Sequence, residues 1–178
     1  MIIFTRYLLE PEVGPHLSVI KKIYVHPEYD DHLFTNNIAL IKLNFEVELG
    51  ELLQTVCLPK GYEGNLPIPK KYGVAPCWQR LSGAKVSTIQ SDRKCSNSSL
   101  TLFNSSMSFC AKDKKTANDT WCNRGGSFVQ KVRREDGYRW VATGIENFGK
   151  RNARKGRFSF YTKLYPFINW IRATMKRE

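Results

Sequence analysis

The sequence has no long apolar run, and this absence bears on the class of protein. Hydrophobic residues make up 42% of the 178 residues, yet no stretch approaches the roughly 20 consecutive apolar residues that cross a bilayer. Residues 1–12 contain only a short apolar run that Arg6 interrupts, and they lack the apolar core of a secretion signal. We therefore expect no membrane span, and we expect any secretion signal to lie upstream of Met1.

Acidic residues are scarce relative to basic ones. The chain has 16 Asp and Glu against 28 Lys and Arg, which gives a net charge of +12. A positive surface attracts polyanions by electrostatics alone, so an anionic glycan such as heparin is a candidate partner. The sequence has no zinc-ligand spacing, no basic helix and no aromatic RNA-binding strand, so nucleic acid is not expected as a partner. The basic clusters lie at residues 70–71, 131–134, 150–151, 154–155 and 176–177.

The five cysteines include no C-x-x-C pair, so neither a metal site nor another cofactor is expected. Three N-x-[ST] sequons begin at Asn97, Asn104 and Asn118 within one loop-rich stretch. Sequons close together, in a chain with several cysteines, favour an oxidising secretory compartment. We therefore expect a secreted glycoprotein. Because five is odd, one thiol is free or pairs outside this chain.

Short apolar segments, alternating or continuous, are separated by polar turns throughout most of the chain, a pattern typical of β-strands. There is no internal repeat and no low-complexity linker, and the length allows one domain or two small halves. A soft boundary lies at residues 58–69, where Pro, Gly and Lys gather. The strands are expected near residues 2–7, 17–25, 38–43, 72–78, 85–89, 107–111, 127–132, 139–145 and 157–162.

The C-terminal end has a different period. Apolar residues recur there at three- and four-residue spacing, which predicts one amphipathic helix. The expected fold class is therefore all-β with a C-terminal α-helix. The apolar positions are Leu164, Phe167, Ile168, Ile171 and Met175.

Six segments together resemble the trypsin-like (chymotrypsin-fold, peptidase S1) serine proteases. They occur in the order of that family and at close to its spacing, across most of the chain. The resemblance implies a double six-stranded β-barrel with a C-terminal helix. The segments are V-H-P-E-Y (25–29), N-N-I-A-L-I-K-L (36–43), V-C-L-P (56–59), F-C-A (109–111), W-V-A-T-G-I (140–145) and F-Y-T-K-L…W-I (160–171).

The match begins with strands that, in the family, follow the catalytic histidine. We therefore expect residues 1–178 to form a partial domain whose first barrel is incomplete. In this interpretation residues 1–60 are the remainder of the first barrel, residues 61–163 form the second barrel, and residues 164–178 form the helix.

The family's chemistry needs a serine nucleophile, a histidine base and an aspartate that orients the histidine and stabilises its charged form. By the resemblance, Asn37 stands at the aspartate position. A carboxamide carries no charge and favours the wrong histidine tautomer, and this substitution costs the family about 10⁴ in turnover. The alternative interpretation, that Asn37 is an ordinary hydrogen-bonded buried amide, assigns it no chemistry either.

The histidine position cannot be assigned, because the family's A-A-H-C segment is absent from this sequence. The histidines of the chain are His16, His26 and His32. His16 follows a proline in an expected turn, His26 belongs to the V-H-P-E-Y segment, and His32 lies in an acidic loop. Each is expected to be a turn or surface residue rather than a catalytic base.

The serine position, immediately before Gly125-Gly126, is occupied by Arg124. A guanidinium stays protonated and offers only donors, so it is no nucleophile. Asn123 replaces the preceding acid, and the turn after Cys122 is two residues shorter than the family's C-x-G-D-S-G-G. We therefore do not expect an oxyanion hole in register. Ser127, in a shifted G-G-S turn, remains an alternative nucleophile.

The substrate pocket is the next feature that the resemblance locates. Its floor falls at Asp119 or Thr120, where an acid would favour a basic side chain of the substrate, although Asp119 also belongs to a sequon in a loop. Its wall is the segment Asn147-Phe148-Gly149. Ser159 stands where trypsin-like members have glycine, and we expect it to narrow the pocket.

The resemblance also implies how the cysteines pair. Cys95 and Cys110 match a family disulfide that closes a surface loop. Cys57 matches the cysteine that ties the domain to an upstream segment. Cys77 and Cys122 lack their usual partners, and we expect them to pair with each other.

These features predict a non-catalytic serine protease homologue that acts as a secreted binding or regulatory module. Its expected partner is a protein: a protease, a substrate, or an upstream chain joined through Cys57. Two alternatives stay open. The chain could be a fragment or variant of an active trypsin-like serine endopeptidase, or a basic protein whose main function is to bind heparin-like polyanions.

Overall fold

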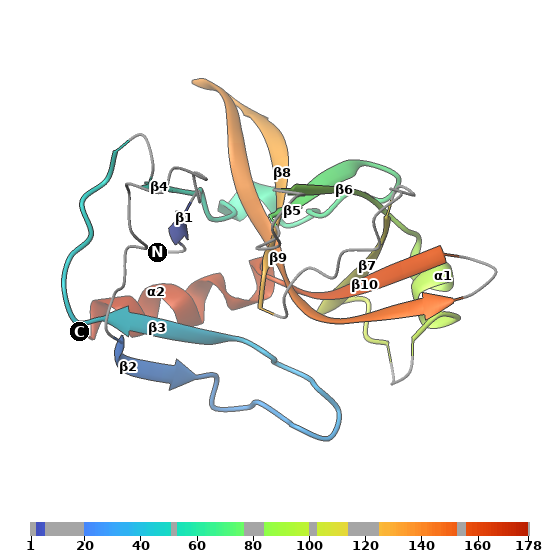
Figure 1. Cartoon of the computed structure of the whole chain (residues 1–178), viewed down its shortest axis with the longest axis horizontal. Helices are drawn as coiled ribbons and strands as arrows, with labels where there is room; N and C mark the ends of the chain where they lie inside the picture. The colour runs from blue at the N-terminus through green and yellow to red at the C-terminus, as the bar shows by residue number, and fades with distance from the viewer. Residues whose placement is uncertain are drawn as a thin grey trace, which may run out of the picture.

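A computed structural model describes residues 3–5, 20–50, 53–76, 84–99, 103–113, 125–152 and 156–177. It is dominated by β-strands, with a closed six-stranded barrel and a short C-terminal helix (Figure 1). The expected fold class is thereby confirmed. The strands are β1 (Ile3–Thr5), β2 (Ile20–Val25), β3 (Ala39–Leu43), β4 (Leu53–Thr55), β5 (Tyr72–Pro76), β6 (Ala84–Ile89), β7 (Ser108–Asp113), β8 (Ser127–Arg134), β9 (Gly137–Asn152) and β10 (Gly156–Lys163).

The helical segments are short. They are α1 (Asp92–Ser96), α2 (Ile168–Lys176) and the 3₁₀ turns η1 (Gly61–Glu63) and η2 (Tyr165–Phe167). The expected C-terminal helix is thus α2 preceded by the proline-containing turn η2, so regular α-helix begins at Ile168 rather than near Leu164. The sequence pattern did not predict β4 or α1, because segments of three and five residues are too short to show a period.

The closed barrel is antiparallel, with the strand order β10-β7-β6-β5-β8-β9. Alternate residues of its strands point inward, and three aromatic rings fill the centre. Phe128 lies 5.3 Å from Phe109 and 5.0 Å from Tyr161 between ring centroids. Gly73 lies directly against this core, because an added Cβ would come within 2.1 Å of the Phe128 ring. The buried residues of this core are Ala75, Ile89, Phe109, Ala111, Phe128 and Tyr161.

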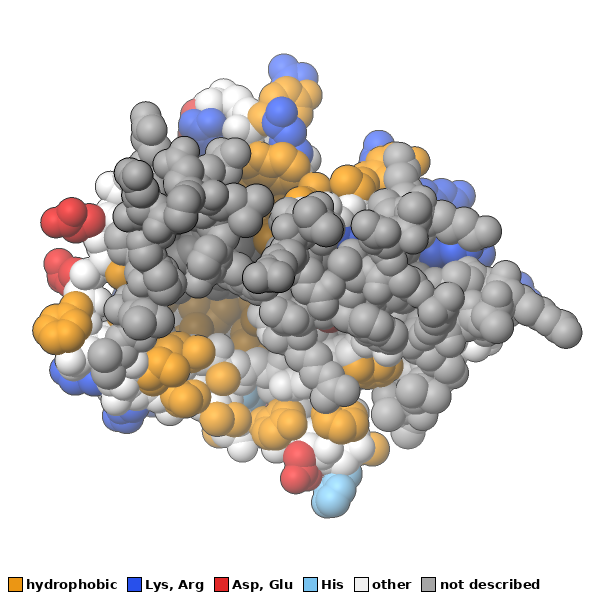
Figure 2. Space-filling view, in the orientation of Figure 1, with side chains coloured by type: hydrophobic (Ala, Val, Ile, Leu, Met, Phe, Trp, Pro, Cys, Tyr) orange, Lys and Arg blue, Asp and Glu red, His pale blue; other side chains and the backbone are white. Residues whose placement is uncertain are grey.

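The described residues before η1 form two separate two-stranded sheets, β1–β4 and β2–β3. In the β2–β3 hairpin, Ile23 pairs with Ile41 and Val25 pairs with Ala39, so these four side chains share one face. Ile23, Val25 and Ile41 are each 55% exposed. Figure 2 shows hydrophobic side chains gathered over β2, β3 and their connecting loop. Within the described part of the chain, this first set of strands does not close into a barrel.

The opposite face of the hairpin packs on a second core that joins it to α2 and the barrel. Leu40 of β3 packs against this core. The His26 ring, just after β2, also contacts Phe167 and Trp170, with ring centroids 5.2 Å and 4.9 Å apart. The C-terminal helix therefore holds the hairpin in place. The buried residues of the second core are Ile38, Val129, Ala142, Leu164, Phe167, Ile168 and Ile171.

A buried ion pair ties the η1 turn to the end of β8. Arg134 Nε and Nη2 each donate to the Glu63 carboxylate at 2.8 Å, and Nη2 also donates to the Leu58 carbonyl at 3.0 Å. The side chains are only 7% and 4% exposed. The hydrogen bond from Arg134 holds the pKa of Glu63 below its ordinary value, and Glu63 raises the pKa of Arg134.

No helix among the described residues is both long enough and apolar enough to span a bilayer.

Candidate functional site

A cleft of about 730 Å³ lies between the β2–β3 hairpin and the middle of β9. Its volume is within the range of ligand-binding pockets, about 300–1,000 Å³. Most of its walls are apolar, and the exposed face of the hairpin supplies one side. The lining residues are Ile23, Tyr29, Phe34, Asn37, Ile38, Ala39, Ile41, Gly125, Ile145, Glu146, Asn147, Phe148 and Gly149.

The Thr162 hydroxyl links two asparagines of this cleft. Thr162 Oγ1 lies 3.1 Å from the backbone carbonyl oxygen of Asn37 and 2.9 Å from Asn147 Oδ1, and it donates its proton to one of them at a time. This contact fixes the backbone of Asn37 beside β9 and β10. The Asn37 side chain is a carboxamide, so it carries no negative charge that could orient and stabilise a protonated histidine.

The loop before Asn37 is held by local hydrogen bonds. Asp30 accepts from the backbone N–H groups of His32 and Leu33, both at 2.8 Å, and these bonds lower the pKa of its carboxyl group. Asn36 has a positive φ of 49°, a conformation that asparagine tolerates better than most residues. Its side-chain amide donates to the Glu28 carbonyl at 2.8 Å. These contacts place Asn37 at the cleft.

The Gly125-Gly126 turn is bound to β9 by its backbone. The Gly125 N–H donates to the Glu146 carbonyl at 2.8 Å, and the Glu146 N–H donates to the Gly126 carbonyl at 2.7 Å. Gly125 lines the cleft with a φ of +82°, which L side chains rarely adopt. Because its N–H is already bonded to Glu146, Gly125 does not offer that donor to an oxyanion in the cleft.

Ser127, the alternative nucleophile, is the first residue of β8 and pairs with Ile145. It is 5% exposed, its Oγ is buried and has no hydrogen-bond partner among the described residues, and it does not line the cleft. An attacking oxygen must be reachable by the substrate and lie within hydrogen-bond distance of a base. Ser127 is buried away from the cleft, and no base in the described part of the chain bonds to its hydroxyl.

The two histidines that the structure describes lie away from the cleft lining. The His26 ring is packed on α2, and its Nδ1 accepts from the Glu28 N–H at 3.2 Å. The His32 side chain is 94% exposed and lies 3.6 Å from Asp31. Neither imidazole is therefore placed in the cleft as a base would be. His16 is outside the described residues.

Three residues that we expected in the wall of a substrate pocket line the cleft. Asn147, Phe148 and Gly149 line it from β9, and the Phe148 ring stacks on Phe160 at 4.8 Å. Ser159 is 1% exposed, lies between Gly149 of β9 and Ala111 of β7, and does not line the cleft. Its Oγ is buried and has no hydrogen-bond partner within the described ranges. The remaining expected positions, Asp119, Thr120, Asn123 and Arg124, lie outside the described residues.

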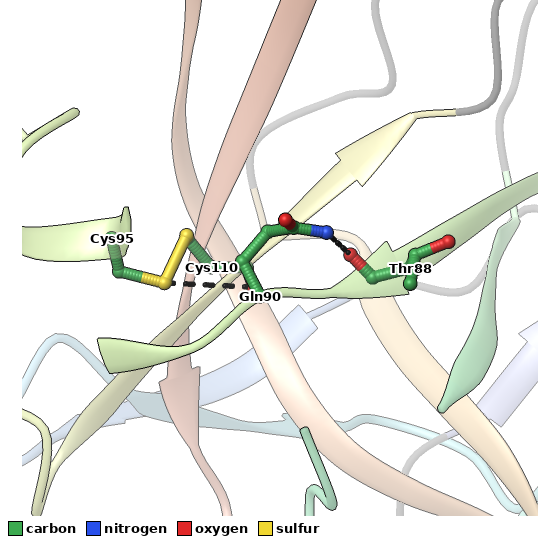
Figure 3. The surroundings of a disulfide bond; sticks show 4 residues. All are labelled: Thr88, Gln90, Cys95 and Cys110. Carbon is green, nitrogen blue, oxygen red and sulfur yellow. Dashed lines mark hydrogen bonds between the residues drawn. A yellow bond between two sulfur atoms is a disulfide. The ribbon is translucent and has the colours of Figure 1, made fainter. Parts of the chain in front are cut away.

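The cysteines, like the expected pocket residues, lie partly inside and partly outside the described ranges. Cys95 of α1 and Cys110 of β7 form a disulfide, with their Cα atoms 5.5 Å apart (Figure 3). The Gln90 N–H donates to the Cys110 carbonyl at 3.0 Å, and the Gln90 side chain donates to the Thr88 carbonyl at 2.7 Å. The Cys57 thiol is partly exposed and unpaired in this structure. Cys77 and Cys122 lie outside the described residues.

Sequence reasoning located Asn37 and the Asn147-Phe148-Gly149 wall, and the structure brings them together. It missed Thr162, although this residue belongs to the matched F-Y-T-K-L segment, and it missed the apolar hairpin face that forms the other wall. The alternation of Ile23 with Val25, and of Ala39 with Ile41, was the available signal. No group of three or more His, Cys, Asp or Glu within the described ranges could hold a metal ion.

Comparison with known proteins agrees with the resemblance. A family model described as Trypsin matches residues 5–171. The Complement C1r subcomponent-like protein of Rattus norvegicus is 29% identical over 171 residues, which cover 88% of this chain and 36% of the relative. The Complement C1s subcomponent of Sus scrofa is 26% identical, with 89% of this chain and 26% of the relative covered. Granzyme B(G,H) of Mus musculus is 28% identical, with coverages of 94% and 67%.

The chain thus spans well under half the length of these two complement relatives.

Proposed function

We propose that this chain, which belongs to the trypsin-like serine protease family, is a non-catalytic member that acts as a binding or regulatory module of a secreted protein. In this proposal residues 1–60 are the remainder of the first barrel, residues 61–163 form the second barrel, and residues 164–178 form the closing helix. The cleft between the two parts keeps the position of a protease active site but serves for binding.

One observation carries the proposal. The described residues that line the cleft include no serine, cysteine, threonine or histidine, so these walls lack both a nucleophile and an imidazole base. By the resemblance, Asn37 stands where the family has an aspartate, and its carboxamide carries no charge. The sequence also has Arg124 immediately before the Gly-Gly turn. The family's acyl transfer needs all three catalytic groups in hydrogen-bond series.

The chemistry of the cleft favours a protein partner. Isoleucines of the hairpin, with aromatic rings from its loop and from β9, form an apolar surface, and the Asn37 and Asn147 amides add a few polar groups. This combination is typical of sites that bind an apolar segment and orient it by hydrogen bonds. We further propose that Cys57 joins the chain to another segment or chain by a disulfide, since its thiol is partly exposed and unpaired.

The proposal predicts that the purified chain does not react with a fluorophosphonate probe. Such probes form a covalent adduct with an activated serine, and we expect no labelling above that of heat-denatured protein. A trypsin-like protease of established activity is the positive control. We also expect no labelling of an Arg124→Ser variant, because a restored hydroxyl would still lack the aspartate. Measurement is by intact-protein mass spectrometry.

The competing hypothesis is an active endopeptidase, and the same experiment separates the two. A stoichiometric adduct on the unaltered chain would contradict the proposal. If the adduct disappeared in a Ser127→Ala variant, Ser127 would be the nucleophile despite its burial.

We also propose that the protein is secreted and glycosylated. The disulfide between Cys95 and Cys110 supports an oxidising compartment. Asn97 and Asn104 are exposed, and the Asn104 Oδ1 accepts from the Ser106 N–H at 3.0 Å and the Ser106 hydroxyl at 2.6 Å. Both hydrogen bonds use the Asn104 Oδ1 atom. They do not involve the side-chain amide nitrogen, which is the atom that carries an N-linked glycan. Asn118 lies outside the described residues and is the third proposed site.

If the protein is secreted and N-glycosylated, removal of its glycans should change its electrophoretic mobility. When the full protein is expressed in a secretory cell line, treatment with an N-glycosidase should increase its mobility. Asn97→Gln and Asn104→Gln should each remove one glycan, whereas Asn44→Gln, which alters an exposed asparagine outside any sequon, should change nothing. Unchanged mobility after enzyme treatment would contradict glycosylation.

A further inference from the structure

A turn joins the end of β8, at Arg134, to the start of β9, at Gly137. The strand segments next to this turn form a two-stranded ribbon that extends beyond the barrel (Figure 1). β5 pairs with β8 only at Val129, and β10 pairs with β9 only from Gly144 onward. The last backbone–backbone hydrogen bond from outside the ribbon runs from the Cys57 N–H to the Trp140 carbonyl at 3.1 Å. Beyond these points, the two strands pair with each other among the described residues.

One face of this ribbon carries two cations and two aromatic rings. Lys131 pairs with Trp140, and Arg133 pairs with Tyr138. Because paired residues share a face, as do residues two apart on a strand, all four side chains lie on the same side, here called the outer face. Tyr138 is 59% exposed and Trp140 is 49% exposed. Lys131 and Arg133 are also exposed.

The space-filling view agrees with this arrangement. Figure 2 shows Lys and Arg side chains beside hydrophobic ones at the top, where Figure 1 places the ribbon. The Lys131 Nζ lies 5.2 Å from the centroid of the Tyr138 ring. The cations and the rings therefore form one continuous surface.

The opposite face of the ribbon is anchored. Arg134, whose side chain points away from the outer face, is held by the buried Glu63 carboxylate and the Leu58 carbonyl. The ribbon is thus fixed from behind, and its outer face is presented without rearrangement. A surface that is already ordered loses less conformational entropy when it binds a ligand.

The positive charge of the outer face is not neutralised locally. Arg139, on the opposite face, pairs with Asp136 at 2.8 Å. Neither Lys131 nor Arg133 forms an ion pair with an acid in the described part of the chain, although the exposed Glu135 lies at the ribbon's turn. Lys131 and Arg133 are two residues apart, which is roughly 7 Å along a strand.

Exposed cations at this spacing, together with flat rings, are suited to a chain that carries both anionic groups and apolar faces. A guanidinium binds the oxygens of a tetrahedral anion through two parallel hydrogen bonds. Tyrosine and tryptophan offer apolar faces with a polar edge. Nucleic acid also carries anionic groups and flat apolar faces. The disulfide, however, supports an oxidising compartment, where the available polyanions are sulfated polysaccharides.

We propose that the outer face of the β8–β9 ribbon, formed by Lys131, Arg133, Tyr138 and Trp140, binds a sulfated glycosaminoglycan chain. The cations pair with sulfate groups and the rings pack against sugar faces. This inference goes beyond the absence of catalysis and rests on the proposed role as a secreted binding module. It does not involve the cleft, so the ribbon and the cleft can be occupied at once.

The test measures binding of the full chain to heparin at several salt concentrations, for the unaltered protein and three double variants. Lys131→Ala/Arg133→Ala removes the cations, Tyr138→Ala/Trp140→Ala removes the rings, and Arg93→Ala/Lys94→Ala makes the same change of charge on α1 as a matched control. Circular dichroism and the midpoint of unfolding establish that each variant is folded.

We expect the two ribbon variants to lose heparin affinity with different dependences on salt. Loss of the cations should weaken binding and lower the slope of log affinity against log salt by about 0.9 per lost contact, as for counterion release from nucleic acids. Loss of the rings should weaken binding by about two- to tenfold per ring with little change of slope. The control variant should retain the affinity of the unaltered protein to within about twofold, since exposed charges at a distance are screened.

Several outcomes would overturn the proposal. Equal losses in the ribbon and control variants would mean that net charge alone binds heparin, and the ribbon would then not be the site. Equal binding of desulfated heparin would exclude sulfate recognition, and tighter binding of single-stranded DNA would assign the surface to nucleic acid. No binding of heparin at physiological salt would exclude a glycan partner altogether. The fluorophosphonate experiment is indifferent to all of these results, so failure of one proposal is distinguishable from failure of the other.

Discussion

Replacing Arg134 with methionine is expected to lower the free energy of unfolding by about 3–5 kcal/mol, because it leaves a buried carboxylate without its partner. Glu63 is 4% exposed and receives two hydrogen bonds from the guanidinium of Arg134, each of 2.8 Å. The change also removes the donor to the Leu58 carbonyl. Denaturant unfolding, followed by circular dichroism, measures the difference.

The same ribbon supplies a matched control. Arg139 pairs with Asp136 at 2.8 Å, but these side chains are 43% and 65% exposed. Exposed ion pairs contribute about 0–1 kcal/mol, so Arg139→Met should have a small effect. Replacing Glu63 and Arg134 together by Leu and Met should cost less than Arg134→Met alone, since no unpaired charge remains. Similar losses for Arg134→Met and Arg139→Met would contradict the structural role of the buried pair.

The contribution of the Glu63–Arg134 pair to stability should decrease as the pH falls. The pKa of Glu63 is held below its ordinary value of 4.5, mainly by the hydrogen bond from Arg134. A carboxyl group whose pKa is lower in the folded state stabilises the fold above its unfolded pKa, and this contribution is lost as the pH falls through the folded pKa. The contribution of Glu63 to the stability of the unaltered protein should therefore be full at pH 7 and be lost as the pH falls below about 4.5. Arg134→Met should lack this contribution, so the stability of the two proteins should converge in acid.

Replacing Phe128 with alanine is expected to lower the free energy of unfolding by about 3–5 kcal/mol, the range for a fully buried aromatic side chain. Phe128 is 0% exposed and contacts both Phe109 and Tyr161, which stack on each other, at the centre of the closed barrel. Gly73 packs directly beneath its ring, so the neighbouring backbone has adapted to this side chain. The loss should leave a cavity that the barrel strands cannot collapse to fill.

An exposed phenylalanine provides the comparison for this prediction. Phe45 lies between β3 and β4 and is 70% exposed, so Phe45→Ala should change the denaturation midpoint little. Phe128→Leu should fall between the two, because it retains much of the apolar volume. If Phe128→Ala unfolded at the same denaturant concentration as Phe45→Ala, the aromatic centre would not stabilise the barrel.

The strand pattern was largely predictable, and the reason is local. The alternation of apolar and polar side chains records which face of a strand is buried, and this pattern located the barrel strands β5 to β8 and β10 to within a few residues. It underestimated β9, which continues to Asn152, because residues 146–152 include only one large apolar residue, Phe148, and so show no alternation. It could not show which strands pair, since pairing joins residues far apart in the chain.

The candidate site was predictable only in part. Motif spacing assigned Asn37 and the wall at Asn147 to Gly149, because these residues lie in segments of strong family resemblance. It did not predict that Thr162 would link Asn37 to Asn147, a contact across 125 residues of sequence in one case and 15 in the other. Nor did it predict the ion pair of Glu63 with Arg134, which depends on the η1 turn meeting the end of β8.

By itself, the sequence determined which chemical groups this protein carries: an arginine before the Gly-Gly turn, an uncharged asparagine at position 37, and an excess of 12 positive charges. These are properties of side chains, and no arrangement of the backbone alters them. Only the tertiary structure decided which groups meet. Pairing of β8 with β9 aligned Lys131 and Arg133 with Trp140 and Tyr138 on one exposed face, while it turned Arg134 inward to Glu63. Strand register is set by contacts distant in sequence, and it alone distributes neighbouring residues between a buried anchor and an exposed binding surface.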